Sequence, residues 1–171
     1  MNKSKLHLER YLEIEKILIH FYTFFDFCLE KCIKPTIEQN NNGPVAVCCK
    51  DKYYMRYDIE DPAFDLLRDG REKLYGKPTE IKNHSGVSPC EYHTTTGCAL
   101  KTHKSPICLS FMCRKSIDEL RERHDIFLYD YLGFNYALEW ILTGDMDGKA
   151  YEEFKDSCLE MITKIKASLK N

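Results

Sequence analysis

The chain has 171 residues, a length that suits one domain, with 25 basic against 27 acidic side chains and a formal net charge of -2. This balance creates no strong field towards nucleic acid or anionic lipid, so neither is expected as a partner. The most apolar run, "ILIHFYTFFDFCL" at 17–29, is interrupted by charge and too short to cross a bilayer. The N-terminal residues lack the uninterrupted apolar stretch of a secretory signal. We therefore expect a single cytoplasmic domain over residues 1–171.

A three-four spacing of apolar side chains predicts one long N-terminal helix over residues 3–34. Its stripe consists of Ile14, Leu18, Phe21, Phe25, Cys28 and Cys32. Pro35 is expected to end this helix, because proline and the residue before it both disfavour continued helix.

A second helix is predicted over residues 62–68, because Asp61 and Pro62 form an N-cap followed by a first-turn proline. Gly70 would lie just beyond its end. Residues 75–89 are loop-like. The "HTTTG" stretch at 93–97 that follows favours a small irregular hairpin.

Ser116 and Glu119 have the spacing of a capping box, and helical spacing then continues to Leu142. The apolar face of this helix is Phe127, Tyr131, Phe134, Leu138 and Ile141, with Gly133 as a kink or a close packing contact. Gly144 is a suitable stop, and a last helix is predicted from Gly148 to Leu169. Its stripe is Tyr151, Phe154, Cys158, Ile162, Ile165 and Leu169. The predicted fold is mainly α: the helix at 3–34 and C-terminal helices within 116–170 bracket an irregular cysteine-rich centre at about 45–115.

Nine cysteines are present, an odd number that cannot pair completely within one chain. A reducing cytosol also argues against a disulfide framework. Cys28, Cys32 and Cys158 fall on apolar helix faces and are interpreted as small buried hydrophobic side chains. The i,i+4 pair Cys28 and Cys32 also faces one way and could present two thiolates to a metal.

Six other cysteines lie in the centre of the chain, beside glycine, proline, serine and threonine: Cys48, Cys49, Cys90, Cys98, Cys108 and Cys113. Loops bury little apolar area, so the entropy of fixing them must be offset in another way. A thiolate metal site does this, because its binding free energy becomes folding free energy. The spacing C-x7-C-x9-C-x4-C from Cys90 is neither that of a zinc ribbon nor that of a bacterial ferredoxin. It predicts metal ligands gathered from separate loops, with free loop thiols as the alternative.

The adjacent Cys48-Cys49, then "PCEYH" and then "GCALKTHKSPIC" resemble the YkgJ-like family of cysteine-cluster domains described as chelating zinc or iron. The matching cysteines are Cys48, Cys49, Cys90, Cys98 and Cys108, with Leu100 as the hydrophobic residue after Cys98. The resemblance covers residues 45–115. It implies a metal centre but no reaction: members are often labelled iron–sulfur oxidoreductases, and a related cluster occurs in flagellin lysine methylases, whose activity is not carried over.

Three features depart from this family pattern. The stretch "NNNGPVAVCC" lacks the cysteines that usually precede the pair, so either Cys28 and Cys32 substitute or the site has fewer ligands. An expected Arg-Pro is Ser105-Pro106, which leaves Lys101 or Lys104 to supply nearby charge. The spacing after this proline is one residue short.

Four thiolates suit either tetrahedral zinc or a [4Fe–4S] cluster. Six candidates exceed the four that either centre needs, which fits the larger cluster better. Adjacent cysteines point in different directions, so the preferred set is Cys49, Cys90, Cys98 and Cys108, with Cys48 and Cys113 in reserve. Three nearby histidines could also ligate zinc but are interpreted as exposed loop residues: His84, His93 and His103.

Three functions remain open from sequence. One is a zinc- or cluster-stabilised interaction module, for which a protein partner is left open. Another is an iron–sulfur oxidoreductase or electron carrier, for which a cleft beside the centre would be the distinguishing feature. The last is a metal-free thiol protein. The sequence supplies no catalytic signature, substrate or partner.

Overall fold

The structure is a computed structural model, which describes residues 3–41, 43, 48–50, 52–55, 60–79, 88–94, 96–130 and 132–170. It is mainly helical, as predicted, with one small two-stranded antiparallel hairpin in the described part. The α-helices are α1 (Lys3–Tyr22), α2 (Lys34–Gln39), α3 (Pro62–Tyr75), α4 (Pro106–Ser110), α5 (Arg114–His124), α6 (Gly133–Thr143) and α7 (Gly148–Ser168). The shorter elements are the π-helix η1 (Leu29–Ile33), the 3-10 helix η2 (Tyr53–Met55), β1 (His93–Thr94) and β2 (Gly97–Cys98).

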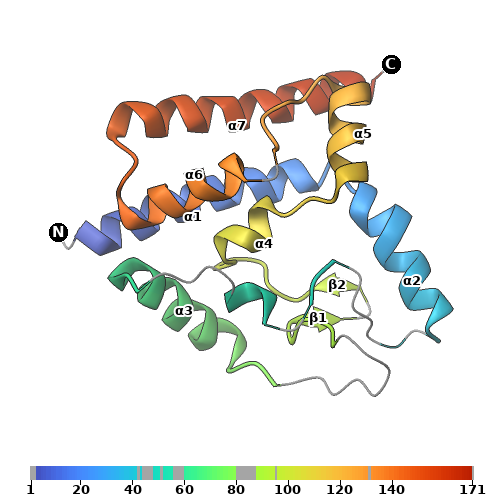
Figure 1. The fold of residues 1–171 in the computed structure, drawn as a ribbon, viewed down its shortest axis with the longest axis horizontal. Coiled ribbons are helices and arrows are strands. Elements are labelled where there is room, and N and C mark those ends of the chain that lie inside the picture. Colours follow the sequence, from blue (N-terminus) through green and yellow to red (C-terminus); the bar gives the residue numbers. More distant parts are fainter. Residues whose placement is uncertain are drawn as a thin grey trace.

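Helix α1 is the centre of the arrangement and contacts α3, α6 and α7 (Figure 1). In Figure 1, α7 lies on one side of α1 and α3 and the hairpin lie on the other, while α6 contacts both α1 and α3. Helix α4 contacts α6 and leads towards the hairpin side, and α5 contacts α7. Among the described helices, none combines the length and the apolar character that a bilayer span requires.

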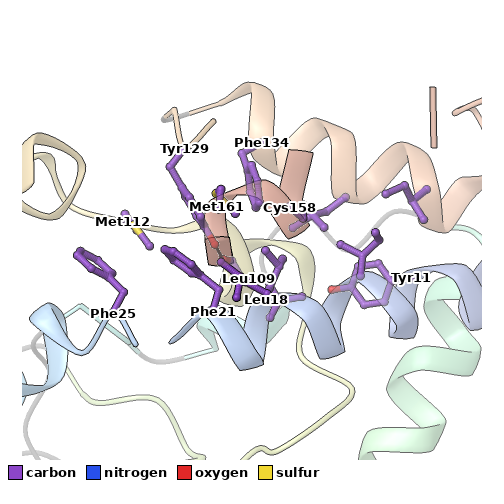
Figure 2. Close-up of a cluster of buried hydrophobic side chains, with 14 of the residues drawn as sticks. Tyr11, Leu18, Phe21, Phe25, Leu109, Met112, Tyr129, Phe134, Cys158 and Met161 are labelled. Carbon is purple, nitrogen blue, oxygen red and sulfur yellow. Dashed lines mark hydrogen bonds between the residues drawn. The ribbon is translucent and has the colours of Figure 1, made fainter. Parts of the chain in front are cut away.

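The main core consists of buried side chains of α1, α6 and α7, with further members from α3, α4 and α5. Figure 2 shows Leu18 and Phe21 of α1 pointing towards Cys158 and Met161 of α7. Leu18, Phe21 and Cys158 are fully buried, so the interpretation of Cys158 as a small packed side chain is confirmed. A smaller, separate hydrophobic cluster on the hairpin side consists of the buried residues Tyr54, Cys90, Tyr92 and Leu100.

The prediction of one helix over residues 3–34 is wrong, because α1 ends at Tyr22. The Thr23 hydroxyl donates to the His20 carbonyl over 2.7 Å, and the chain turns before the next helical segment. Phe25 nevertheless remains buried and stacks on Phe21 at 5.8 Å between ring centroids. The helical spacing of buried apolar residues therefore continues past the end of α1, so spacing alone could not predict where α1 ends.

Pro35 does not end a helix but lies in the first turn of α2. A proline is tolerated there, because the first N–H groups of a helix have no intrahelical acceptor. The preceding η1 is widened, with the Lys34 N–H bonded to the Leu29 carbonyl. This widening gives the proline ring room against the previous turn.

Helix α3 begins as predicted and ends later than predicted. The Asp61 carboxylate accepts a hydrogen bond from the Ala63 N–H over 2.7 Å, which confirms the N-cap. The helix passes through Gly70 and ends at Gly76, whose φ of +78° suits glycine. Gly70 permits a close approach instead, since a Cβ there would lie 2.4 Å from Cδ2 of His103.

The predicted helix from Ser116 to Leu142 is two helices. Cys113, not Ser116, is the N-cap of α5, and Glu119 pairs with Arg123 rather than closing a capping box. Asp125 ends α5 in the left-handed conformation with φ +54°, a position that usually takes glycine. Its carboxylate lies 3.1 Å from Nζ of Lys164.

The predicted apolar face of this region is only partly present. Phe134, Leu138 and Ile141 are buried on α6, whereas Phe127 is 61% exposed and Tyr131 lies outside the described residues. Gly133 is the first residue of α6, where a Cβ would lie 2.8 Å from an Asp130 carboxylate oxygen.

The C-terminal predictions are largely confirmed. Gly144 ends α6 with φ +84°. Helix α7 has nearly the predicted bounds, and Tyr151, Ile162 and Ile165 are buried as expected. Leu169 is 57% exposed, so it does not belong to the buried stripe.

Candidate metal centre

A buried carboxylate of α1 positions the chain between the hairpin and α4. Glu15 is 1% exposed and accepts hydrogen bonds from the Thr102 hydroxyl at 2.8 Å and from the backbone N–H groups of His103 at 2.9 Å and Lys104 at 2.7 Å. These three bonds satisfy the buried charge and fix the loop. Sequence reasoning did not select Glu15, although its place one residue after Ile14 and three before Leu18 puts it on the buried side.

A buried cation of α3 holds the same loop from the other side. Arg71 is 1% exposed, and its Nε donates to the carbonyl of His103 over 2.7 Å. Its guanidinium also lies 5.4 Å from the ring centroid of Tyr54. Sequence reasoning did not select Arg71, because the helix was predicted to end at residue 68, whereas α3 continues to Tyr75.

Four cysteines line a cavity of about 70 Å³ beside the hairpin. We call them the hairpin tetrad: Cys49, Cys90, Cys98 and Cys108. Local pairing brings them together, because the Cys90 N–H donates to the Cys49 carbonyl over 3.1 Å and Cys98 pairs with His93 across the hairpin. The cavity thus gathers the four cysteines that the sequence placed first among the candidates.

His93 also lines this cavity and differs from the exposed loop residue expected from sequence. Its side chain is 8% exposed, and neither ring nitrogen has a hydrogen-bond partner among the described residues. Burial lowers the pKa of His93, which favours the neutral imidazole. Buried nitrogens without partners are costly, so this ring is suited to a group that would complete its hydrogen bonds or bind it.

His103 is not among the residues that line this cavity. His103 is partly buried, with φ +59° and its Nδ1 3.2 Å from the Thr102 hydroxyl. His84 lies outside the described residues.

Two polar side chains contact sulfur atoms of the hairpin tetrad. The Lys104 ammonium donates to Sγ of Cys98 over 3.2 Å, which locates the positive charge expected from the sequence. The Ser105 hydroxyl donates to Sγ of Cys108, also over 3.2 Å. Both donors would stabilise negative charge on sulfur.

Burial acts in the opposite direction on the deeper thiols. It raises the pKa of Cys90 to about 12 and also raises the pKa of Cys49 and Cys108. The neighbouring cysteines add to this rise at all three positions. A bound cation would reverse the balance, because a coordinating thiol loses its proton.

The two adjacent cysteines belong to different groups. Cys49 lies with the hairpin tetrad, whereas the electrostatic neighbours of Cys48 include Cys28, Cys32 and Cys113. A larger cavity of about 380 Å³ is lined by Cys28 and by five of the six sequence candidates, all except Cys90, together with apolar side chains of the α1–η1 segment and α4.

The four thiols of the hairpin tetrad are suitable metal ligands, but their sulfur atoms are not placed around a single ion position. In the described part of the chain, no three histidine, cysteine, aspartate or glutamate side chains are placed to hold a single metal ion. Tetrahedral zinc with bonds of about 2.3 Å would bring sulfur atoms to about 3.8 Å from one another. A four-iron cluster spreads its thiolates over a wider span.

Comparison with known proteins gives no match to any family model, curated protein or solved structure.

Proposed function

We propose that this chain is a metal-binding protein whose centre is held by the four thiolates of the hairpin tetrad. The observation that carries the proposal is the cavity of about 70 Å³, where four cysteines surround a buried histidine with no hydrogen-bond partner among the described residues. Packing alone gives no reason to bury an imidazole without partners. With a metal centre present, His93 would donate its N–H to a ligated sulfur.

An iron–sulfur cluster is the favoured occupant and a zinc ion the alternative. A cluster is larger than a single ion and can accept ligands from separated loops, as the members of the hairpin tetrad are. Lys104 beside Cys98 would offset part of the negative charge of such a centre. Zinc would supply structural stability alone if all four positions were protein ligands.

An oxidoreductase or electron-carrier role is supported by the larger cavity. It opens beside Cys49, Cys98 and Cys108, so a second molecule could approach the sulfur ligands there. A cluster, when bound, would supply one-electron chemistry at this position. Glu15 and Arg71 would hold the adjoining loop in place.

The proposal includes the resemblance to YkgJ-like cysteine-cluster domains. This resemblance rests on the spacing of five cysteines, which are the hairpin tetrad and Cys48. It also places the chain in the cytoplasm, because reduced thiols are available as ligands there. A protein partner belongs to the interaction-module alternative, in which the metal only holds the centre together.

The test is to measure iron, sulfide and zinc per chain after purification without oxygen, in the unmodified protein, Cys98→Ser and Cys158→Ala. We expect Cys98→Ser to lose one centre, whereas Cys158→Ala, a change of a fully buried thiol in the main core, keeps its metal. Equal metal contents in all three proteins would overturn the proposal.

A His93→Phe variant distinguishes two roles of His93: a side chain that only packs, and a side chain that hydrogen-bonds a metal ligand. A packed ring predicts a more stable protein with unchanged metal affinity, because two unsatisfied nitrogens are removed. The proposal predicts a metal affinity that is lower by about 10–100-fold, as expected for loss of a group that hydrogen-bonds a ligand. Competition with a chelator measures this difference.

A further inference from the structure

Four cysteines lie outside the hairpin tetrad and the main core, and three of them, Cys28, Cys48 and Cys113, line the larger cavity. We call these four the N-terminal tetrad: Cys28, Cys32, Cys48 and Cys113. We propose that these four side chains are a second thiolate metal site, separate from the hairpin tetrad and able to hold a zinc ion or an iron–sulfur cluster of its own.

The strongest evidence is the convergence of two sulfurs on one hydroxyl group. The Ser116 Oγ lies 3.0 Å from Sγ of Cys28 and 3.2 Å from Sγ of Cys113. The two sulfur atoms are therefore separated by no more than the sum of these distances, although Cys28 precedes η1 and Cys113 is the N-cap of α5. Because Ser116 is fully buried, this hydroxyl serves the sulfurs and not the solvent.

Cys48 supplies a third thiol from another part of the chain. It lines the larger cavity together with Cys28 and Cys113. Burial raises its pKa to about 11, and the neighbouring thiols of Cys28, Cys113 and Cys32 also act to raise this pKa. Adjacent side chains point in different directions, so Cys48 joins this group while Cys49 joins the hairpin tetrad.

Cys32 completes the set from η1. It lies four residues after Cys28, and side chains at this spacing share one side of a helix. It is an electrostatic neighbour of both Cys28 and Cys48. The helix is widened to the π form at this point, a distortion that is frequent at functional sites.

Packing does not explain this group. Cys158, the ninth cysteine, is 0% exposed within the main core, whereas all four members of the N-terminal tetrad are partly exposed. The eight cysteines outside the core thus divide into two sets of four, which is the number that either centre requires.

The test counts centres. The intact chain, stripped of metal and kept reduced, is reconstituted with Zn²⁺ alone or with Fe²⁺ and sulfide, and the bound equivalents are measured. The same is done for Cys28→Ser/Cys32→Ser, for Cys90→Ser/Cys98→Ser and for Cys158→Ala. We expect two centres in the unmodified chain and in Cys158→Ala, and one in each double variant.

Each other result is decisive. Two centres in Cys28→Ser/Cys32→Ser, or a single centre that only Cys90→Ser/Cys98→Ser loses, overturns the second site and leaves the hairpin tetrad. A single centre that only Cys28→Ser/Cys32→Ser loses overturns the hairpin tetrad instead. A single centre lost by both overturns the division into two sites, and no bound metal overturns both proposals. Circular dichroism checks folding; if Cys28→Ser/Cys32→Ser does not fold, Cys113→Ser replaces it with the same expectations.

Discussion

The helical frame of α1, α6 and α7 and the cysteine-bearing centre are stabilised by different means. In the frame, apolar side chains such as Leu18, Leu138 and Ile165 are fully or almost fully buried against one another. In the centre, the loops are held by buried charges, by short backbone pairings and by sulfur contacts. Apolar packing therefore accounts for the frame, whereas under the proposed function a metal bound by the thiols would add to the stability of the centre.

Metal removal should have the largest effect, and only on one of these regions. A structural zinc site contributes on the order of 10 kcal/mol to the part that it holds. We expect the amides of Cys90, His93 and Ala99, which are bonded in and around the hairpin, to exchange more than about a thousandfold faster after chelation. Amides of α1, α6 and α7 should change little. Equal acceleration in both regions, or none, would contradict the comparison.

A cavity in the frame should have the converse effect. Leu138→Ala removes a fully buried side chain of α6 and should lower the free energy of unfolding by about 2–5 kcal/mol, measured in urea. The metal content of the folded protein should not change. Trp140→Ala on the same helix is the control, because Trp140 is 51% exposed and its loss should cost far less.

The contact between the two regions can be weakened at Glu15. Glu15→Gln replaces a carboxylate that accepts three hydrogen bonds, and should lower the unfolding free energy by about 1–3 kcal/mol. Metal affinity should fall as well, since the loop carries Lys104 towards Cys98. Glu13→Gln on the same helix is the control, because Glu13 contacts only Tyr151 and Lys155 of α7 in the described bonds. Equal metal affinity in both variants would show that Glu15 does not position the centre.

The smallest effect concerns a buried carboxyl of the frame. Burial raises the pKa of Glu139, against the hydrogen bond that Asn135 donates to it. Between the usual and the raised pKa the folded chain keeps a proton that the unfolded chain has lost, so stability falls as pH rises through that window. Glu139→Gln should remove this slope and raise stability at neutral pH by on the order of 1 kcal/mol or less. Urea unfolding in mild acid and at neutral pH measures it; an unchanged slope would assign the dependence to other groups.

Sequence periodicity predicted most of the frame because burial there follows helical spacing. It predicted α7, and residue types rather than periodicity predicted the stop of α6 at Gly144 and, outside the frame, the N-cap of α3 at Asp61. It missed the break after Tyr22, because Phe25 is buried although it lies outside any helix, so the helical spacing of apolar residues continues across the break.

For the cysteine-bearing centre, the sequence predicted which residues are present but not how they are arranged in space. The residue types and the hairpin at "HTTTG" were recognisable. The burial of His93 and the close approach of His103 to Gly70 depend on tertiary contacts that no local pattern encodes. The second group of thiols includes Cys28 and Cys32, which local spacing assigned to an apolar stripe.

The central claim is that cysteine sulfur atoms hold a metal, and X-ray absorption at the iron and zinc edges of protein purified without oxygen tests it most directly. The account predicts a shell of sulfur neighbours at about 2.3 Å, with an additional iron–iron shell if the centre is a cluster. A first shell of oxygen and nitrogen alone, or protein without metal, would contradict it.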